Sequence, residues 1–504
     1  MINFMRKNEV GKGVIFMYIQ LISTMITGFV FYIILARITS AEIIGTFSLV
    51  VAISEIIANI AILGIPESIQ RFFGKYFLQK KLIEAKLFVR ISIFFIIGSI
   101  LVSASIVILI RHYISEIFHI DLNLIIIIDL LIASYAIYTL LYSIVVASLK
   151  TKSLALIVTI SSVAKVILAT VLILIGSGVI GLALGYTFFA QVLSSILLGV
   201  ILLKLFESAG GSSKHGLSIK TASKNLLIGG LVVWIPTLIT TVGIDLGTLV
   251  LYDIHGAYQS GIYFVTFAMF NALNAVTISI FAISLPVLSS MTDGRKMFTW
   301  QTMRLGSIIA LPLSSSLIFY SSDIMQLIGT NYAEGSFSFQ ILLISMFPNL
   351  IFGGVEALVF AYGNYRYTLI INLASSIPRT ILYFALVPFF GMTGVAMSYT
   401  IGSLVGFIVS SIIGKRIKMI VDWRILIWTL ILPISIGFTL STLNINYVIG
   451  IICTIIVSYL ILIKLHIVLE SDISFLVGLL PDAISNSLTT MLGKLKKISR
   501  HFYK

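Results

Sequence analysis

The sorting of positive charge between long apolar runs is the feature that most limits how this chain can fold. When the chain is threaded through a bilayer along these runs, 29 of its 33 Lys and Arg residues fall on one side, two on the other and two inside the hydrocarbon. Cytoplasmic loops of membrane proteins carry an excess of Lys and Arg. The pattern predicts a multi-pass protein of the cytoplasmic membrane, with both chain termini and the basic loops in the cytoplasm.

Composition agrees with this prediction. Apolar residues make up 59% of the 504 residues and charged residues only 10%, too few to cover the surface of a soluble domain. An α-helix satisfies all of its backbone groups within the bilayer, so we expect helices rather than a barrel. No predicted loop is long enough to hold a soluble catalytic domain.

We therefore expect an all-α integral membrane fold with about 14 spans, each near the roughly 20 residues needed to cross hydrocarbon. The predicted spans are 14–36, 43–64, 87–110, 122–148, 154–175, 179–205, 226–250, 258–286, 304–320, 337–363, 367–390, 393–413, 425–441 and 446–468. After Asp482, apolar residues recur at helical spacing among basic ones, which favours an amphipathic helix on the membrane surface.

A long polar break and a weak internal repeat divide the chain. Shifting the sequence by 216 residues aligns 35–49 with 251–265, and it matches Ala41 with Ala257 and Gly45 with Gly261. Both segments join the first and second spans of a six-span half, so we expect parallel repeats with a binding cleft between two lobes. The predicted parts are a first lobe at 1–206, a cytoplasmic linker at 207–224, a second lobe at 225–414, two further spans within 415–468 and a cytoplasmic tail at 469–504.

Six ionisable residues lie well inside predicted spans. They are Glu55, Asp129, Lys165, Asp245, Glu356 and Arg379. A charge at the bilayer centre costs roughly 2.5–3.5 kcal/mol on insertion scales, so each of these should face a wet cavity or a partner.

The two cations among them occupy equivalent places. Lys165 lies in the fifth span and Arg379 in the eleventh, its repeat equivalent, and 379 minus 165 is 214, close to the repeat offset. We expect both near the midplane, where an ammonium and a guanidinium together suit a phosphate or diphosphate group. The alternative is that they pair with the buried acids and only hold helices together.

The acids and nearby polar residues leave two interpretations open. Glu55, Asp129, Asp245 and Glu356 are candidates for coupling a proton or Na⁺, or for salt bridges to the two cations. The predicted polar lining of the cavity is Asn271, Asn274, Asn372, Ser376 and Thr241. Hydrogen bonds between helices are the alternative role for these side chains.

Several other classes of function lack their signals. The sequence has no histidine pair at zinc-ligand spacing and no glycine-rich phosphate loop followed by lysine, so we expect no metal, no cofactor and no nucleotide hydrolysis. The net charge of +14 follows from membrane orientation and needs no nucleic acid to explain it.

Four features together resemble a known family. They are LARITSAEIIGTFSL at 35–49, GIPESIQRFFGKY after the second span, the 14-span plan and DISFLVGLLP in the tail. The chain resembles the polysaccharide-transporter branch of the multidrug/oligosaccharidyl-lipid/polysaccharide exporter superfamily. The resemblance implies two six-helix lobes, two further helices and a flippase for a lipid-linked oligosaccharide. Arg37 and Arg71 match its pattern at membrane edges, where we expect structural or gating roles.

The expected function is thus transport rather than catalysis. A cationic cavity would hold the phosphate of a polyprenyl-linked oligosaccharide while the lobes alternate between two openings. We expect a monomer in the lipid bilayer, with glycan-assembly enzymes as further partners. The alternatives are a cation-coupled multidrug exporter of the same superfamily, a membrane glycan polymerase or glycosyltransferase, and a scaffold for glycan assembly.

Overall fold

The computed structural model describes residues 16, 20, 23–207, 218–291 and 293–468, and every regular element among them is helical. The first half of the chain forms the helix Ser23–Ile38, α2 (Ala41–Ala61), α3 (Ile65–Leu78), α4 (Leu82–Leu109), α5 (Arg111–Phe118), α6 (Leu122–Ala147), α7 (Thr151–Leu174), α8 (Gly178–Ala183), the π-helix η1 (Leu184–Phe188) and α9 (Phe189–Glu207). The second half forms α10 (Ile219–Ser290), α11 (Arg295–Phe319), α12 (Ser321–Ile328), the 3₁₀-helix η2 (Thr330–Gly335), α13 (Ser336–Ile344), α14 (Met346–Ala361), α15 (Tyr365–Arg416), α16 (Trp423–Thr442) and α17 (Tyr447–Lys464).

Eleven helices among the described residues are long and apolar enough to cross a membrane, so the chain is a multi-pass membrane protein. The expected count of 14 spans is not confirmed. Two pairs of predicted spans each lie in one helix, α10 and α15, that is interrupted at a glycine, and the first predicted span is described only in part, as the helix Ser23–Ile38.

Both continuous helices bend sharply at a glycine. Gly256 in α10 has φ 78° and Gly391 in α15 has φ 51°, values that favour a residue without a Cβ. The glycines fall in the two very short connections that the sequence predicts between spans, so the chain reverses with almost no loop. Pro378 lies inside α15 without breaking its helical backbone, and the bend comes at Gly391 instead.

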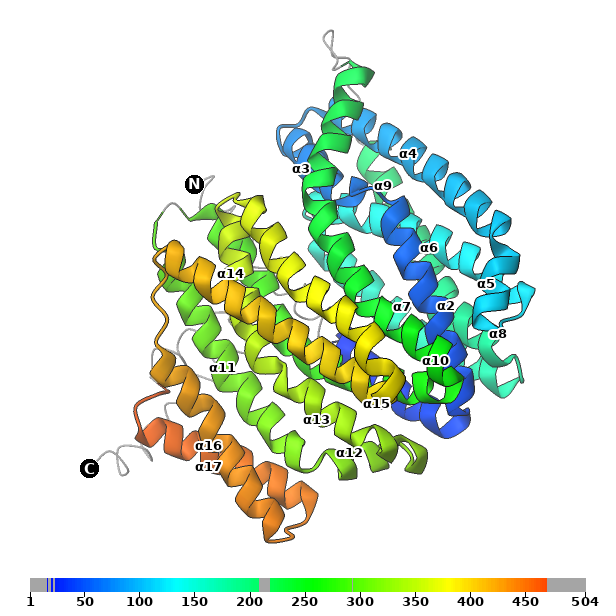
Figure 1. Ribbon diagram of the computed structural model, residues 1–504. Helices are drawn as coiled ribbons and strands as arrows, with labels where there is room; N and C mark the ends of the chain where they lie inside the picture. Colours follow the sequence, from blue (N-terminus) through cyan, green and yellow to red (C-terminus); the bar gives the residue numbers. More distant parts are fainter. Residues whose placement is uncertain (1–15, 17–19, 21–22, 208–217, 292, 469–504) are drawn as a thin grey trace.

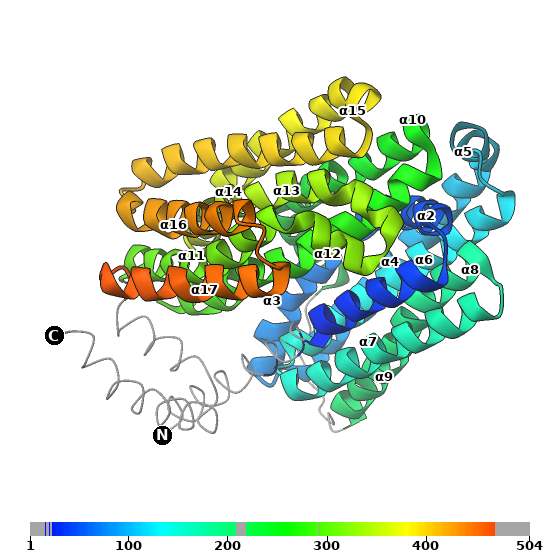
Figure 2. The same ribbon diagram turned by 90° about the horizontal axis from the view of Figure 1, so that it is seen from below.

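The helices form two lobes, and α10 of the second lobe lies along the boundary between them (Figure 1). The first lobe consists of the helix Ser23–Ile38 and α2 to α9, and the second lobe consists of α10 to α15. Helices α16 and α17 lie against α11 at the outer edge of the second lobe, and the view from below shows the same placement (Figure 2).

The lobes meet most extensively where α2 packs on α10. A side-chain carbon added at Gly45 would collide with the backbone of Ala257, and one added at Gly261 would collide with the backbone of Ala41. The contact is therefore reciprocal between the residues that the sequence repeat aligns. Ser48 and Ser260 add a contact of 3.1 Å between their hydroxyl oxygens. Small side chains at this crossing let two helix backbones touch.

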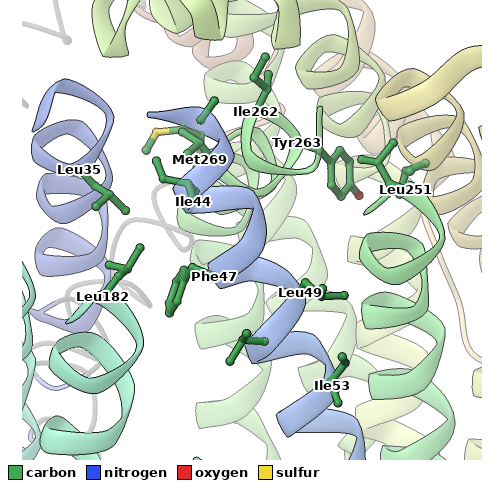
Figure 3. Packing of buried hydrophobic residues seen from close by; sticks show 14 of the residues in the cluster. Leu35, Ile44, Phe47, Leu49, Ile53, Leu182, Leu251, Ile262, Tyr263 and Met269 are labelled. Carbon is green, nitrogen blue, oxygen red and sulfur yellow. The ribbon is translucent and has the colours of Figure 1, made fainter. Parts of the chain in front are cut away.

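Apolar side chains pack around the same crossing (Figure 3). Phe47 of α2 lies toward Leu182 of the first lobe, whereas Ile44 lies toward Ile262 and Met269 of α10. Large apolar side chains elsewhere point outward, as in Leu109 of α4, which is 81% exposed. An apolar outer surface of this kind is what a lipid solvent requires.

The predicted linker is only partly described. Residues 208–217 lie outside the described part of the chain, but α10 already begins at Ile219, inside the segment predicted as linker. Ala222 is buried there, as is Leu226 just beyond the predicted linker, so packing extends the helix into the polar stretch that marked a boundary in the sequence. The predicted tail at 469–504 lies wholly outside the described residues.

Candidate functional site

Arg379 lies inside the second lobe, on α15, with 4% of its surface exposed. Its guanidinium carbon stands 4.2 Å from the ring centre of Tyr399, and its Nη2 donates to Ser403 Oγ at 3.5 Å. Its Nε is buried and has no hydrogen-bond partner. Gly402 permits this packing, because a Cβ at that position would stand 2.8 Å from the Cβ of Arg379. The charge is thus held by a ring and a hydroxyl, with no carboxylate among its contacts.

A cavity of about 420 Å³ opens beside this guanidinium. All of its lining residues belong to α10, α14 and α15, so the second lobe forms its walls. Its polar lining consists of Thr240, Asn274, Thr277, Asn349, Glu356, Ser375, Arg379, Tyr399 and Ser403. Aromatic side chains of Phe281, Phe352 and Phe360 supply much of the remaining wall.

Glu356 is held by a short chain of hydrogen bonds at the wall of the cavity. Asn372 Nδ2 donates to Glu356 Oε1 at 2.6 Å, and Thr240 Oγ1 donates to Asn372 Oδ1 at 2.9 Å. The amide of Asn372 is therefore used on both sides, and the carboxylate is fixed in place. Glu356 and Arg379 line the same cavity without forming an ion pair, so the salt-bridge alternative has no support here.

Lys165 lies inside the first lobe, on α7, and is half-buried. Its Nζ stands 4.3 Å from the ring centre of Tyr186, which belongs to the π-helix η1. Single π-helical turns occur frequently at functional sites. Lys165 does not line the cavity beside Arg379. The structure therefore places the two predicted phosphate ligands in separate lobes.

The two cations share one local arrangement that sequence reasoning missed. Tyr186 follows Lys165 by 21 residues and Tyr399 follows Arg379 by 20, so each ring comes from the next predicted span. Each ring is also held by aromatic neighbours. Tyr186 stacks on Phe31 at 4.4 Å, and Tyr399 meets Phe267 edge-on at 5.4 Å. The signal in the sequence is this nearly equal spacing after each intramembrane cation.

The remaining three acids are absent from the lining of the cavity. Asp129 on α6 and Asp245 on α10 each keep one buried carboxylate oxygen without a hydrogen-bond partner. Glu55 on α2 is half-buried, and its backbone carbonyl accepts from Asn59 Nδ2 at 2.8 Å. None of the three lines the cavity beside Arg379.

The predicted polar lining divides between cavity and packing. Asn274 lines the cavity, with 6% of its surface exposed. Asn372 and Ser376 are buried in the lobe, one bonded to Glu356 and the other packed on Gly243. Asn271 is exposed, and Thr241 lies beside the lining residue Thr240. Neighbouring residues on an α-helix point about 100° apart. The prediction of Thr241 in place of Thr240 therefore selected a side chain on a different face of α10.

The two arginines at predicted membrane edges are exposed. Arg37 Nη2 donates to the carbonyl oxygen of Leu327 at 3.2 Å, which ties the end of the helix Ser23–Ile38 to α12 of the second lobe. Arg71 on α3 stands 5.7 Å from the ring centre of Phe72. Arg37 thus contacts the opposite lobe in this conformation.

Comparison with known families and structures gives a consistent result. A family model described as "Polysaccharide biosynthesis protein" matches residues 10–292, more than half of the chain. A structure described as "Lipid II flippase MurJ, inward closed conformation" is similar with TM-score 0.67 and 16% identity, and the match covers 90% of this chain and 98% of that one. Curated protein sequences give no match.

Transporters of a second kind share the fold. A structure described as "Crystal structure of MATE in complex with MaL6" is similar with TM-score 0.59 and 14% identity, over 81% of this chain and 96% of that one. A transporter from Pyrococcus furiosus, whose description notes "reverse polarity of binding pocket", is similar with TM-score 0.53 and 14% identity, over 81% and 95% of the two chains. At these identities the similarity establishes the fold.

Proposed function

Because the chain belongs to the polysaccharide biosynthesis protein family, we propose that it is a flippase for a lipid-linked oligosaccharide. The substrate has a polyprenyl phosphate or diphosphate carrier and moves from the cytoplasmic to the outer leaflet of the cytoplasmic membrane. Both chain termini and the basic loops face the cytoplasm in this proposal. The working unit is a monomer, and glycan-assembly enzymes are its further partners.

One observation carries the proposal. Arg379 is 4% exposed, stands beside a cavity and has no carboxylate among its contacts. An unpaired cation in the middle of a membrane protein is costly, so it calls for an anionic ligand. The phosphate of a lipid carrier is such a ligand, and a guanidinium binds it with two parallel hydrogen bonds.

Lys165 supplies the second cation of the proposed path. It lies in the other lobe at the repeat-equivalent position, also against an aromatic ring. In this proposal the lobes rock about the α2–α10 contact, and the phosphate meets Lys165 and Arg379 at successive stages of transport. The glycan stays in the polar interior, and the polyprenyl chain stays in lipid.

The membrane potential is a sufficient driving force for such a substrate. When the cell interior is negative, each negative charge that moves outward gains about 2.3 kcal/mol per 100 mV. Transport therefore needs no nucleotide hydrolysis by this chain.

A cation-coupled exporter is the second candidate. The similarity to the MATE structures favours it, as do the unpaired buried oxygens of Asp129 and Asp245. Carboxylates of this kind bind protons or Na⁺ in membrane transporters.

Reconstituted transport separates the two candidates. The full chain in proteoliposomes is given a lipid-linked oligosaccharide, and its arrival in the opposite leaflet is measured under an imposed potential. The flippase proposal expects transport that rises with the potential and falls in Arg379→Gln, with the exposed Arg366→Gln as a matched control. Absence of lipid transport, together with drug efflux driven by a proton or Na⁺ gradient, would support the exporter.

A further inference from the structure

The cavity in the second lobe is lined by two residues that each carry a buried polar atom with no hydrogen-bond partner among the described residues. Arg379 Nε is a donor and Asn274 Oδ1 is an acceptor, and their residues are 4% and 6% exposed. Both residues line the cavity. A buried polar atom without a hydrogen bond is unfavourable, because it has lost its bonds to water. A ligand that satisfies both atoms must accept a hydrogen bond at one place and donate one at another.

The rest of the lining repeats this division. Ser403 Oγ accepts a hydrogen bond from Arg379 on one side of the cavity. Glu356 is an acceptor that Asn372 holds in place. Asn372 and Arg379 are seven residues apart on α15, which is about 10 Å along a helix axis. The carboxylate and the guanidinium therefore mark two regions of the cavity, one that repels an anion and one that attracts it.

The chemistry of a phosphorylated sugar fits both regions. A phosphate offers oxygens to Arg379, and sugar hydroxyls offer donors to Asn274 Oδ1 and to the Glu356 carboxylate. Inorganic phosphate alone would satisfy the first region and leave the second unpaired. A neutral sugar would do the reverse.

The size of the cavity limits how much of a glycan it can take. Its volume of about 420 Å³ falls in the lower part of the range of small-molecule pockets, roughly 300–1,000 Å³. The space suits one sugar unit and its phosphate rather than an oligosaccharide. The remaining sugars must lie outside it.

We propose that the second-lobe cavity binds the phosphorylated sugar unit of the substrate, with the phosphate at Arg379 and the hydroxyls at Asn274 and Glu356. This assignment rests on the proposed flippase function, because it names the part of the lipid-linked glycan that this cavity recognises. It makes Asn274 and Glu356 residues that select for sugar, and it leaves the binding of the charge to Arg379.

Binding of soluble probes to the full chain in nanodiscs tests the assignment. Calorimetry compares glucose 1-phosphate, galactose 1-phosphate and N-acetylglucosamine 1-phosphate with inorganic phosphate. At least one sugar phosphate should bind about tenfold more tightly than inorganic phosphate, since it adds hydrogen bonds to two buried acceptors. Asn274→Ala should abolish this preference, and Arg379→Gln should weaken every probe.

Two further variants protect the test against misfolding. Glu356→Gln keeps the shape and an acceptor for Asn372, so it should fold, retain phosphate binding and lose part of the preference for sugar. Asn123→Ala, an exposed asparagine at the start of α6, should change nothing. Equal binding of sugar phosphates and inorganic phosphate, unaffected by Asn274→Ala, would overturn the assignment.

The outcome is independent of the transport assay. If none of the probes binds while lipid-linked oligosaccharide is still transported, the cavity assignment is wrong and the flippase proposal stands. If a sugar phosphate binds with the expected preference but no lipid-linked substrate moves, the cavity assignment stands and the flippase proposal is wrong.

Discussion

The two lobes hold their intramembrane cations in the same way but not to the same degree. In each lobe the cation lies over a tyrosine ring that follows it by 20 or 21 residues, at 4.3 Å for Lys165 and 4.2 Å for Arg379. Arg379 is buried beside a cavity and has Ser403 as an additional partner, whereas Lys165 is half-buried.

The contact between cation and tyrosine ring is common to both lobes, whereas the hydrogen bond to Ser403 and the adjacent cavity are features of Arg379. An aromatic face attracts a cation without neutralising it and uses none of its hydrogen bonds. Among the described residues neither cation has a carboxylate partner, so both charges are available to an anion. In the second lobe a cavity of about 420 Å³ also lies beside Arg379, so we expect this lobe to dominate substrate recognition. Four predictions test this ranking of the lobes.

The largest effect is expected from Arg379→Gln. Loss of a buried charged partner of the substrate costs about 2–5 kcal/mol, so lipid transport should fall by about 100-fold. The measurement is the initial rate in proteoliposomes, compared with Arg366→Gln at equal protein content. A rate within twofold of the wild type would show that the second lobe does not dominate substrate recognition.

Lys165→Gln should lower the rate by about tenfold, a smaller loss because a half-buried ammonium acts as a point charge. The exposed Lys152→Gln, on the same helix, is the matched control. The same assay measures both variants. A loss in Lys165→Gln that exceeds the loss in Arg379→Gln would reverse the ranking of the two lobes.

Removal of the rings should have a smaller effect than removal of the charges. Tyr399→Leu and Tyr186→Leu each lose a cation–π contact of about 1 kcal/mol, so transport should fall about fivefold. Tyr399→Phe keeps the ring face and should retain nearly the full rate, which a merely structural role of the hydroxyl would not allow. Equal losses in Tyr399→Leu and Tyr399→Phe would exclude positioning by the ring.

Ser403→Ala should have the smallest effect, a decrease of about twofold, because the hydrogen bond it removes is long. In this variant Arg379 keeps its contact with the ring of Tyr399 but loses its hydroxyl partner, which leaves it in the same situation as Lys165 beside Tyr186. Ser410→Ala, whose hydroxyl bonds only within its own helix, is the control. A loss as large as that of Arg379→Gln would mean that Ser403 contacts the substrate itself.

Particular residues show how far the sequence could predict this site. The cost of charge in hydrocarbon identified Arg379 and Glu356, and the predicted polar lining included Asn274. All three line the cavity. Tyr399 and Ser403 escaped notice because an aromatic or hydroxyl side chain in an apolar span is unremarkable by itself. Their role appears only when α15 folds back at Gly391 and brings its second part against its first.

The sequence by itself determined that the surrounding solvent is lipid and that the fold is helical, and it singled out the charged residues within the apolar runs, because apolar runs and the cost of a buried ion act on each segment locally. Its repeat also marked Gly45 and Gly261, which pack reciprocally where the lobes meet. Only the tertiary structure decided that Tyr186 and Tyr399 face the two cations and that the described cavity is lined by Arg379 but not by Lys165. Those outcomes depend on which helix faces pack together, and apolar faces differ too little in composition to specify their neighbours from the sequence.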